Sequence, residues 1–233
     1  MEPRDASVLI TGGTGGLGAA VTAEFLANGW RVVAPWRHER ELDRVERHER
    51  LELVKADLFE PDAVAEVAQA AGADQAAPLR AVVNLVGGYA GGSKVHQTPV
   101  EDFERQLRLN LRPTYLVTKA TVPLLIRAGG GTVVCVSSRA AVRPFPGAAG
   151  YIAAKAAVLA FAQAVAAEYA ADGVRCNAVL PSVIDTPAQR ASAPDADHSK
   201  WVAPADIAAV LHFLSTDASR PLSGAAVPVY GRA

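Results

Sequence analysis

Tyr151 and Lys155 stand four residues apart in an alanine-rich stretch, YIAAK. Residues at this spacing share one face of a helix, so the phenol and the amine would point the same way. A free tyrosine has a pKa of about 10, and a neighbouring ammonium favours the phenolate and lowers that pKa. A fall of about 3 units corresponds to roughly 4 kcal/mol. The pair therefore predicts a phenol that gives a proton to a carbonyl oxygen, or takes one from an alcohol, near neutral pH.

The chain around this pair alternates short apolar runs with amphipathic stretches. The apolar runs predict strands over 7–10, 31–34, 51–56, 81–86, 132–137, 174–180 and 225–230. Between them, helices are predicted over about 16–27, after Pro61, and over about 100–127, 151–170 and 204–215. Strands that are apolar throughout are typical of a parallel sheet covered on both faces. The alternation predicts an α/β fold: a Rossmann-like, doubly wound, seven-stranded, mostly parallel sheet with helices on both faces.

The glycine-rich segment TGGTGGLG (11–18) joins the first predicted strand to the first helix. At that place a glycine turn lets the backbone approach a pyrophosphate, which the helix amino terminus then stabilises. No Lys-Ser or Lys-Thr follows the turn, which excludes a P-loop. A plain tight turn is the alternative, but the position between strand and helix favours nucleotide binding.

With this motif the chain resembles the short-chain dehydrogenase/reductase family over essentially its whole length. Thr11, Gly12, Gly16 and Gly18 fit the Thr-Gly-x-x-x-Gly-x-Gly pattern of the classical branch. Gly12, Gly15 and Gly18 also fit the motif of the extended branch. Extended members carry a further substrate domain, for which 233 residues leave no room, so the classical branch is expected.

The resemblance implies four catalytic residues. Tyr151 resembles the family's acid–base tyrosine, and Lys155 resembles the lysine that also binds the nicotinamide ribose. Ser138, thirteen residues before the tyrosine, resembles the serine that holds the substrate oxygen, and Asn110 resembles the asparagine that holds a water for proton relay. Each residue alone has an ordinary structural explanation, whereas all four at family spacing favour a catalytic group.

The second strand ends in VVAPWRHE, where Trp36 takes the place of the acid that NAD-binding proteins use on the ribose. Arg37 follows, and a guanidinium suits a 2′-phosphate, so NADP(H) is favoured over NAD(H). The alternatives are that Arg37 only begins the charged segment 37–50 or stacks on adenine. The family resemblance implies the other residues that bind the dinucleotide, which are Gly12, Thr14, Gly16, Leu17, Gly18, Asp57, Leu58, Asn84, Gly87, Tyr151, Lys155, Pro181, Ile184 and Thr186.

The substrate is less well specified. Segments 84–94 and 180–201 resemble those of the dihydropteridine reductases, a subgroup that reduces a quinonoid ring with NADH and lacks the catalytic serine. Ser138 is present and the acid for NADH is absent, so we expect reduction of a ketone or ketoacyl carbonyl with NADPH. A quinonoid dihydropteridine reductase is the alternative, and a non-catalytic nucleotide-sensing protein is an alternative of another class.

Three loop features carry further expectations. Residues 186–203, with Pro187 and Pro194, are expected to form a lid over the cleft. His96 and His198 are expected in surface loops, and no metal site is predicted. Segment 37–50 holds similar numbers of arginines and acids, which predicts a solvated helix with local ion pairs.

Length and composition predict one domain over residues 1–233, with a small-molecule carbonyl substrate as its partner. The net charge of −1 argues against binding to nucleic acid or an anionic membrane, and neither a secretory signal nor an apolar run of about 18 residues is apparent. Cys135 and Cys176 are expected as buried reduced thiols of a cytoplasmic protein. The resemblance implies a homodimer or homotetramer formed through the long fourth and fifth helices.

Overall fold

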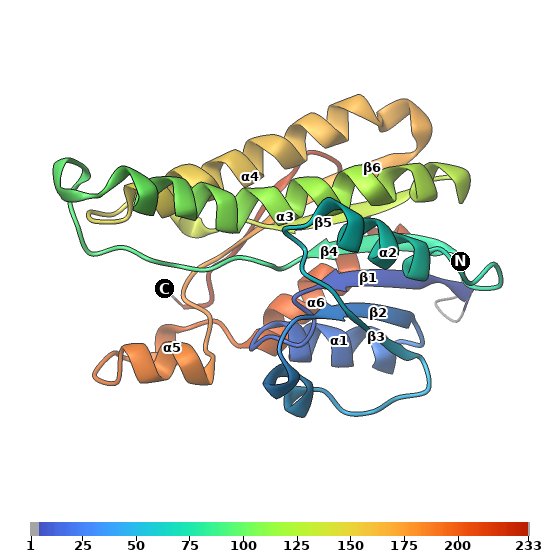
Figure 1. The fold of residues 1–233 in the computed structure, drawn as a ribbon, viewed down its shortest axis with the longest axis horizontal. Helices are drawn as coiled ribbons and strands as arrows, with labels where there is room; N and C mark the ends of the chain where they lie inside the picture. Colours follow the sequence, from blue (N-terminus) through green and yellow to red (C-terminus); the bar gives the residue numbers. More distant parts are fainter. Residues whose placement is uncertain (1–4, 233) are drawn as a thin grey trace.

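The computed structural model describes residues 5–232, so the ends of the domain predicted over 1–233 lie outside the described residues. Its sheet has seven strands in the order β3-β2-β1-β4-β5-β6-β7, and every neighbouring pair is parallel (Figure 1). The strands are β1 (Ser7–Thr11), β2 (Arg31–Trp36), β3 (Leu51–Lys55), β4 (Leu79–Asn84), β5 (Gly131–Val136), β6 (Val174–Pro181) and β7 (Ala226–Val229). The predicted doubly wound sheet is confirmed, and it is parallel throughout.

Helices cover both faces of this sheet (Figure 1). They are α1 (Gly18–Ala27), α2 (Pro61–Ala71), α3 (Val100–Arg127), α4 (Ala149–Glu168), α5 (Pro187–Ser192) and α6 (Pro204–Leu214). Alternate residues of a strand point to opposite faces. Accordingly Leu9 of β1 packs in the core beneath α2, α3 and α4, whereas Val8 and Ile10 pack in the core above α1 and α6. The continuous apolar runs of the sequence are therefore buried from both sides.

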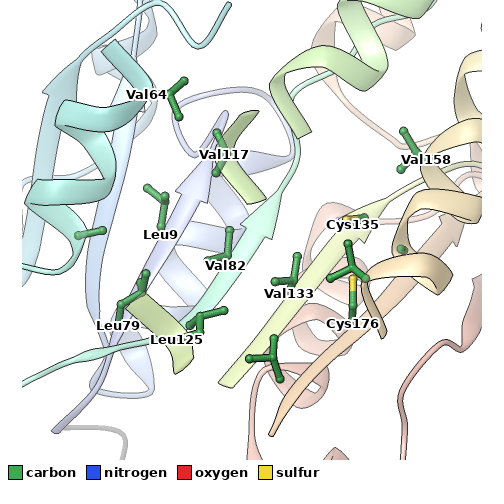
Figure 2. Packing of buried hydrophobic residues seen from close by; sticks show 14 of the residues in the cluster. Leu9, Val64, Leu79, Val82, Val117, Leu125, Val133, Cys135, Val158 and Cys176 are labelled. Carbon is green, nitrogen blue, oxygen red and sulfur yellow. The ribbon is translucent and has the colours of Figure 1, made fainter. Parts of the chain in front are cut away.

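The core beneath α2, α3 and α4 also holds the two cysteines. Figure 2 shows Cys135 of β5 and Cys176 of β6 close together among valine and leucine side chains. Both are buried and free, as predicted. A hydrogen bond with Cys135, together with burial, raises the pKa of the Cys176 thiol. Both cysteines therefore act as small apolar side chains of the core.

The prediction of a helix within segment 37–50 is wrong for most of the segment. Only Glu39–Arg44 is helical, as a 3-10 helix, and none of its residues is buried. Most helical stability in proteins comes from packing an apolar face, and this segment has none to bury. The segment is solvated as predicted, and its first arginine, which is expected at the 2′-phosphate of the cofactor, pairs with Asp57 after β3.

Helix α4 is long and apolar enough to cross a membrane by length and composition, contrary to the expectation that no such run exists. Composition alone does not separate a membrane span from the core helix of an α/β sheet. Here α4 packs on the sheet and against α3, and its buried side includes Gly150, Ala154 and Ala162. The small side chains let the helix lie close to the sheet, which places Tyr151 and Lys155 beside the end of β5.

Candidate active site

A cleft of about 1400 Å³ follows the carboxyl ends of the strands. From β1 the chain runs outward through β2 to β3 and then crosses back to β4 on the other side of β1, so the strand order reverses between β1 and β4. Open α/β sheets bind their ligands at such a point. The register pairs Thr11 with Asn84, which brings the loops after β1 and β4 to the same edge. The cleft runs from Arg37 and Asp57 at one end to Ser138 and Tyr151 at the other.

The glycine turn after β1 forms the floor of the cleft. Gly12 has φ of 68°, a conformation that favours glycine. A Cβ atom at Gly18 would overlap the carbonyl oxygen of Gly12, so only glycine lets α1 begin there. Within residues 5–232 no side chain caps the amino terminus of α1. Its first residues, Gly18 and Ala19, line the cleft, where a helix amino terminus can hold the pyrophosphate of a dinucleotide.

The end of the cleft beside β2 and β3 carries charged side chains that form an ion pair and hydrogen bonds with their neighbours. Arg37 Nη2 lies 3.3 Å from Asp57 Oδ2. Glu41 Oε2 accepts hydrogen bonds from Thr14 Oγ1 at 3.2 Å and from the Arg37 amide at 3.3 Å. Sequence reasoning missed Glu41, and the only signal was its place four residues after Arg37. Leu58 lines the same end, so these residues can hold the adenosine half of a dinucleotide.

Three of the four predicted catalytic side chains meet at the other end. Ser138 follows β5, Tyr151 lies in the first turn of α4, and Lys155 lies one turn further on. Ser138 forms a side-chain hydrogen bond with Tyr151. The Lys155 Nζ donates to the carbonyl oxygen of Val136 at 3.0 Å, and Ser137 Oγ donates to the carbonyl oxygen of Lys155 at 2.7 Å. These bonds fix α4 to the end of β5, so the phenol, hydroxyl and amine are held at one place.

Burial dominates the pKa values of this group. Burial raises the pKa of Tyr151, although the hydrogen bond with Ser138 lowers it in part. The expected lowering by Lys155 is not seen, because the ammonium is 6.0 Å from the ring centre and removing the phenolate from water costs more. The Lys155 side chain is itself buried, which lowers its pKa to about 8.

Asn110 lies next to this group but does not line the cleft. It is fully buried on α3. Its amide donates to the Gly88 carbonyl at 3.0 Å and accepts from the Gly88 amide at 3.1 Å. A Cβ atom at Gly87 would lie 2.6 Å from Asn110 Oδ1 and 3.0 Å from Lys155 Nζ. Asn110 therefore holds the loop after β4 against the lysine, and its role in a proton relay stays a prediction.

Asn84 is expected to bind the dinucleotide, but its side chain does not line the cleft. Its side chain is buried and donates to Thr118 Oγ1 of α3 at 3.2 Å. Among residues 5–232 its Oδ1 has no hydrogen-bond partner. The side chain points to the α3 face of the sheet, so the cleft is lined by the residues after it, including Gly87.

The remaining expected binding residues line the cleft: Gly12, Thr14, Gly16, Leu17, Gly18, Pro181, Ile184 and Thr186. Thr186 also contacts the glycine turn, because a Cβ atom at Gly16 would lie 3.3 Å from its side chain. Its Oγ1 accepts from the Gln189 amide at 3.3 Å and so caps α5. Figure 1 shows α5 apart from the main body of the sheet.

The two loop histidines do not line the cleft, in keeping with the prediction. His198 Nε2 lies 2.9 Å from the Ala193 carbonyl oxygen, and its ring lies 4.2 Å from that of Trp201. Within residues 5–232, no group of three His, Cys, Asp or Glu side chains is placed to hold a metal ion.

Sequence reasoning missed four residues near Tyr151 that line the cleft: Tyr89, Arg139, Arg143 and Phe145. Their only signal is proximity in the chain, since Arg139 directly follows Ser138 and the others lie in flanking loops.

Fold and site together define a dinucleotide-dependent oxidoreductase. A sequence model of the family described as short chain dehydrogenase matches residues 6–197. The chain is 34% identical over 187 residues to the 2-(R)-hydroxypropyl-CoM dehydrogenase of Xanthobacter autotrophicus, which covers 77% of this chain and 74% of that protein. The protein belongs to the classical short-chain dehydrogenase/reductase family, whose members act on CH–OH or C=O groups with NAD(P).

Solved structures agree with this assignment. A short-chain type dehydrogenase/reductase from Mycobacterium ulcerans superposes with a TM-score of 0.91 at 27% identity, covering 100% of this chain and 90% of that one. The 3-ketoacyl-(acyl-carrier-protein) reductase from Brucella melitensis, solved with NADH, gives 0.86 at 27% identity, covering 97% and 98%. The resemblance of two segments to the dihydropteridine reductases stays a prediction.

Proposed function

We propose that the protein reduces a ketone or ketoacyl carbonyl to an alcohol with NADPH. The observation that carries this proposal is the meeting of Ser138, Tyr151 and Lys155 in the cleft that begins at the glycine turn. The presence of Ser138 favours a carbonyl over a quinonoid ring, because a hydroxyl beside the phenol can hold a carbonyl oxygen. The names of the relatives, which act on hydroxyacyl, ketoacyl and hydroxyalkyl compounds, support the same class of substrate.

The chain's own residues manage the proton. Tyr151 gives its phenolic proton to the carbonyl oxygen, and Ser138 donates a hydrogen bond to the same oxygen. The Lys155 ammonium stabilises the phenolate that remains, because an opposite charge nearby favours the ionised form. Asn110 supports the return of a proton from water by holding the loop beside the lysine. When bound, NADPH supplies the hydride to the carbonyl carbon.

The residues present fit a nicotinamide dinucleotide. Gly18 lets α1 begin directly against the Gly12 carbonyl in a tight turn that lines the cleft, and the uncapped start of α1 suits a pyrophosphate. Lys155 and Tyr151 would hold the nicotinamide ribose, with Pro181, Ile184 and Thr186 beside the ring amide. At the adenosine end the half-exposed Arg37 guanidinium suits a 2′-phosphate, which supports NADPH over NADH.

Other parts of the chain complete the proposal. Residues 186–203, which contain α5, act as a lid that closes over the bound substrate. Exposed aromatic residues on α3, Phe103 and Tyr115, support a homodimer or homotetramer formed through α3 and α4. The two free buried thiols support a reducing, cytoplasmic location.

The test is a spectrophotometric assay that follows loss of reduced-nicotinamide absorbance with NADPH and NADH in parallel. The panel holds a ketoacyl thioester, a diketone, an aromatic ketone and a quinonoid dihydropterin. Ketone turnover with NADPH is the expected result. Turnover of the dihydropterin alone, with NADH, would overturn the proposal in favour of a dihydropteridine reductase.

A further inference from the structure

The two ends of the cleft differ in charge. Both carboxylates that line it, Glu41 and Asp57, lie at the adenosine end. The end beside the catalytic tyrosine is lined by Arg139, Arg143 and Lys155, and among residues 5–232 no carboxylate lines that end. A surface of one sign in a cleft raises the local concentration of ligands of the opposite sign. The substrate end is therefore suited to an anion.

Arg139 and Arg143 lie in the segment that follows Ser138, in which residues Arg139–Ala141 form a 3-10 helix. The Arg143 amide donates to the carbonyl oxygen of Arg139 at 2.8 Å, and both residues line the cleft. The Arg139 guanidinium lies 5.0 Å from the centre of the Tyr230 ring. Two arginines that line the cleft together with Ser138 and Tyr151 point to a use in binding an anion.

Arg143 is the unpaired member of this pair. Across residues 5–232 its guanidinium makes no ion pair and no hydrogen bond, in contrast to Arg37, which pairs with Asp57, and Arg190, which pairs with Asp185. The planar guanidinium carries donors in a fork that matches the two oxygens of a carboxylate. Its donors are therefore available to a ligand in the cleft.

Two aromatic side chains, Tyr89 and Phe145, line the cleft together with Arg143. The Tyr89 and Phe145 side chains are 58% and 44% exposed, and their ring centres are 6.3 Å apart. The Tyr89 ring meets the Tyr151 ring edge to face at 5.2 Å. Exposed rings in a cleft are typical contacts for the apolar body of a small ligand. The Tyr89 ring therefore links the proton-donating phenol to the Phe145 ring, and both rings line the cleft that Arg143 also lines.

We propose that the substrate is a keto acid, with its carboxylate bound by Arg143 and an apolar, ring-bearing body held against Tyr89 and Phe145. This inference rests on the proposed carbonyl reduction and adds the charge of the substrate to it. Arg143 is then a binding residue that selects anionic over neutral carbonyl compounds.

The test compares keto acids with their neutral esters. Benzoylformate and 3-benzoylpropionate, which differ in the spacing of carbonyl and carboxylate, are assayed beside their methyl esters with NADPH. In Arg143→Gln we expect KM for at least one acid to rise about tenfold or more, since hydrogen bonds to charged groups are among the stronger ones. The KM values for the esters stay within about twofold because they offer no charge. Arg143→Lys keeps the charge but not the forked guanidinium. Its KM for the acids should therefore lie between that of the unaltered protein and that of Arg143→Gln.

Arg127→Gln is the matched control, because Arg127 is an exposed arginine at the end of α3, at the opposite edge of the sheet. Equal KM changes for acid and ester in Arg143→Gln overturn the inference, as does turnover of the esters without either acid. In both cases ketone reduction, and with it the proposed function, still stands. Absence of turnover for every carbonyl compound would instead remove the proposed function.

Discussion

The Lys155 amine lies 6.0 Å from the centre of the Tyr151 ring, one turn further along α4. Burial acts on both groups but in opposite directions, raising the pKa of Tyr151 and lowering that of Lys155 to about 8. At neutral pH the phenol is therefore protonated and the amine is charged. These are the states that proton donation to a carbonyl oxygen requires, so the free protein is poised for reduction.

The first prediction concerns the pH dependence of reduction. Lys155 loses its charge as the pH rises through about 8, and with it the stabilisation of the phenolate formed in the reaction. We expect kcat/KM for ketone reduction to fall above that pH, because this quantity reports ionisation in the free protein. Initial rates between about pH 6 and 10 measure it. In Lys155→Arg the charge persists, so the step near pH 8 should vanish from whatever activity remains. A wild-type profile that is level through this region would contradict the assignment.

Lys155 also couples stability to pH. Its pKa is lower in the folded protein than the ordinary 10.5, so between about 8 and 10.5 the unfolded chain binds more protons. The burial cost of the ammonium is therefore present in full below pH 8 and is relieved as the pH rises. We expect Lys155→Met to raise the free energy of unfolding at pH 7 by about 2 kcal/mol, from roughly 3 for the shift less about 1 for the lost hydrogen bond.

Thermal unfolding at several pH values tests this expectation. The difference in Tm between Lys155→Met and the unaltered protein should shrink as the pH rises from about 8 to 10.5. Lys119→Met is the control, since Lys119 is exposed on α3 and its removal should leave Tm nearly unchanged. A variant less stable than the unaltered protein at pH 7, or a Tm advantage that grows between about pH 8 and 10.5, would show that the sign is wrong.

A second substitution tests the glycine turn. In Gly18→Ala the new methyl group would overlap the Gly12 carbonyl oxygen, so the start of α1 must move. We expect the Kd for NADPH, measured by fluorescence titration, to rise at least about tenfold, because the helix amino terminus no longer meets the pyrophosphate. At Gly16 a Cβ atom would approach only the Thr186 side chain, at 3.3 Å, so Gly16→Ala should bind more tightly than Gly18→Ala. The reverse order would contradict this account of the turn.

Cofactor choice depends on Arg37 in the proposal. Arg37→Ala removes the guanidinium suited to a 2′-phosphate, so KM for NADPH should rise about tenfold or more while KM for NADH changes little. Steady-state kinetics with both cofactors give the ratio. Arg40→Ala, at an exposed arginine of the same segment, is the control. An equal effect on both cofactors would assign Arg37 to adenine stacking or to its ion pair with Asp57 alone.

Much of this architecture was predictable from the sequence because it depends on local patterns. Continuous apolar runs indicate strands buried on both faces, and the spacing of Tyr151 and Lys155 indicates one helical face. The glycine turn was predictable for the same reason, since Gly12 and Gly18 each meet a steric need within eight residues.

The rest depends on contacts between distant parts of the chain. The side chain of Asn84 turns toward Thr118, 34 residues away, and Arg37 pairs with Asp57 in the loop after β3. A longer helix in segment 37–50 would need another element to pack against it, and no residue of its short 3-10 helix is buried. The upward shift of the Tyr151 pKa likewise follows from burial, which the spacing of Tyr151 and Lys155 does not reveal.

The final prediction separates carbonyl reduction from pterin reduction through Ser138. Its side chain forms a hydrogen bond with Tyr151, and its Oγ also accepts from the Ala140 amide at 3.1 Å. Ser138→Ala removes the donor aimed at the carbonyl oxygen, so kcat for a ketone should fall about 100-fold, as for removal of one oxyanion donor. A quinonoid ring does not need that donor, so a dihydropteridine reductase would keep most of its activity. Ser137→Ala is the matched control: it loses the bond to the Lys155 carbonyl, which should lower stability more than it lowers the rate per folded molecule. Unchanged ketone turnover in Ser138→Ala would remove the serine from the catalytic group and with it the argument against the pterin.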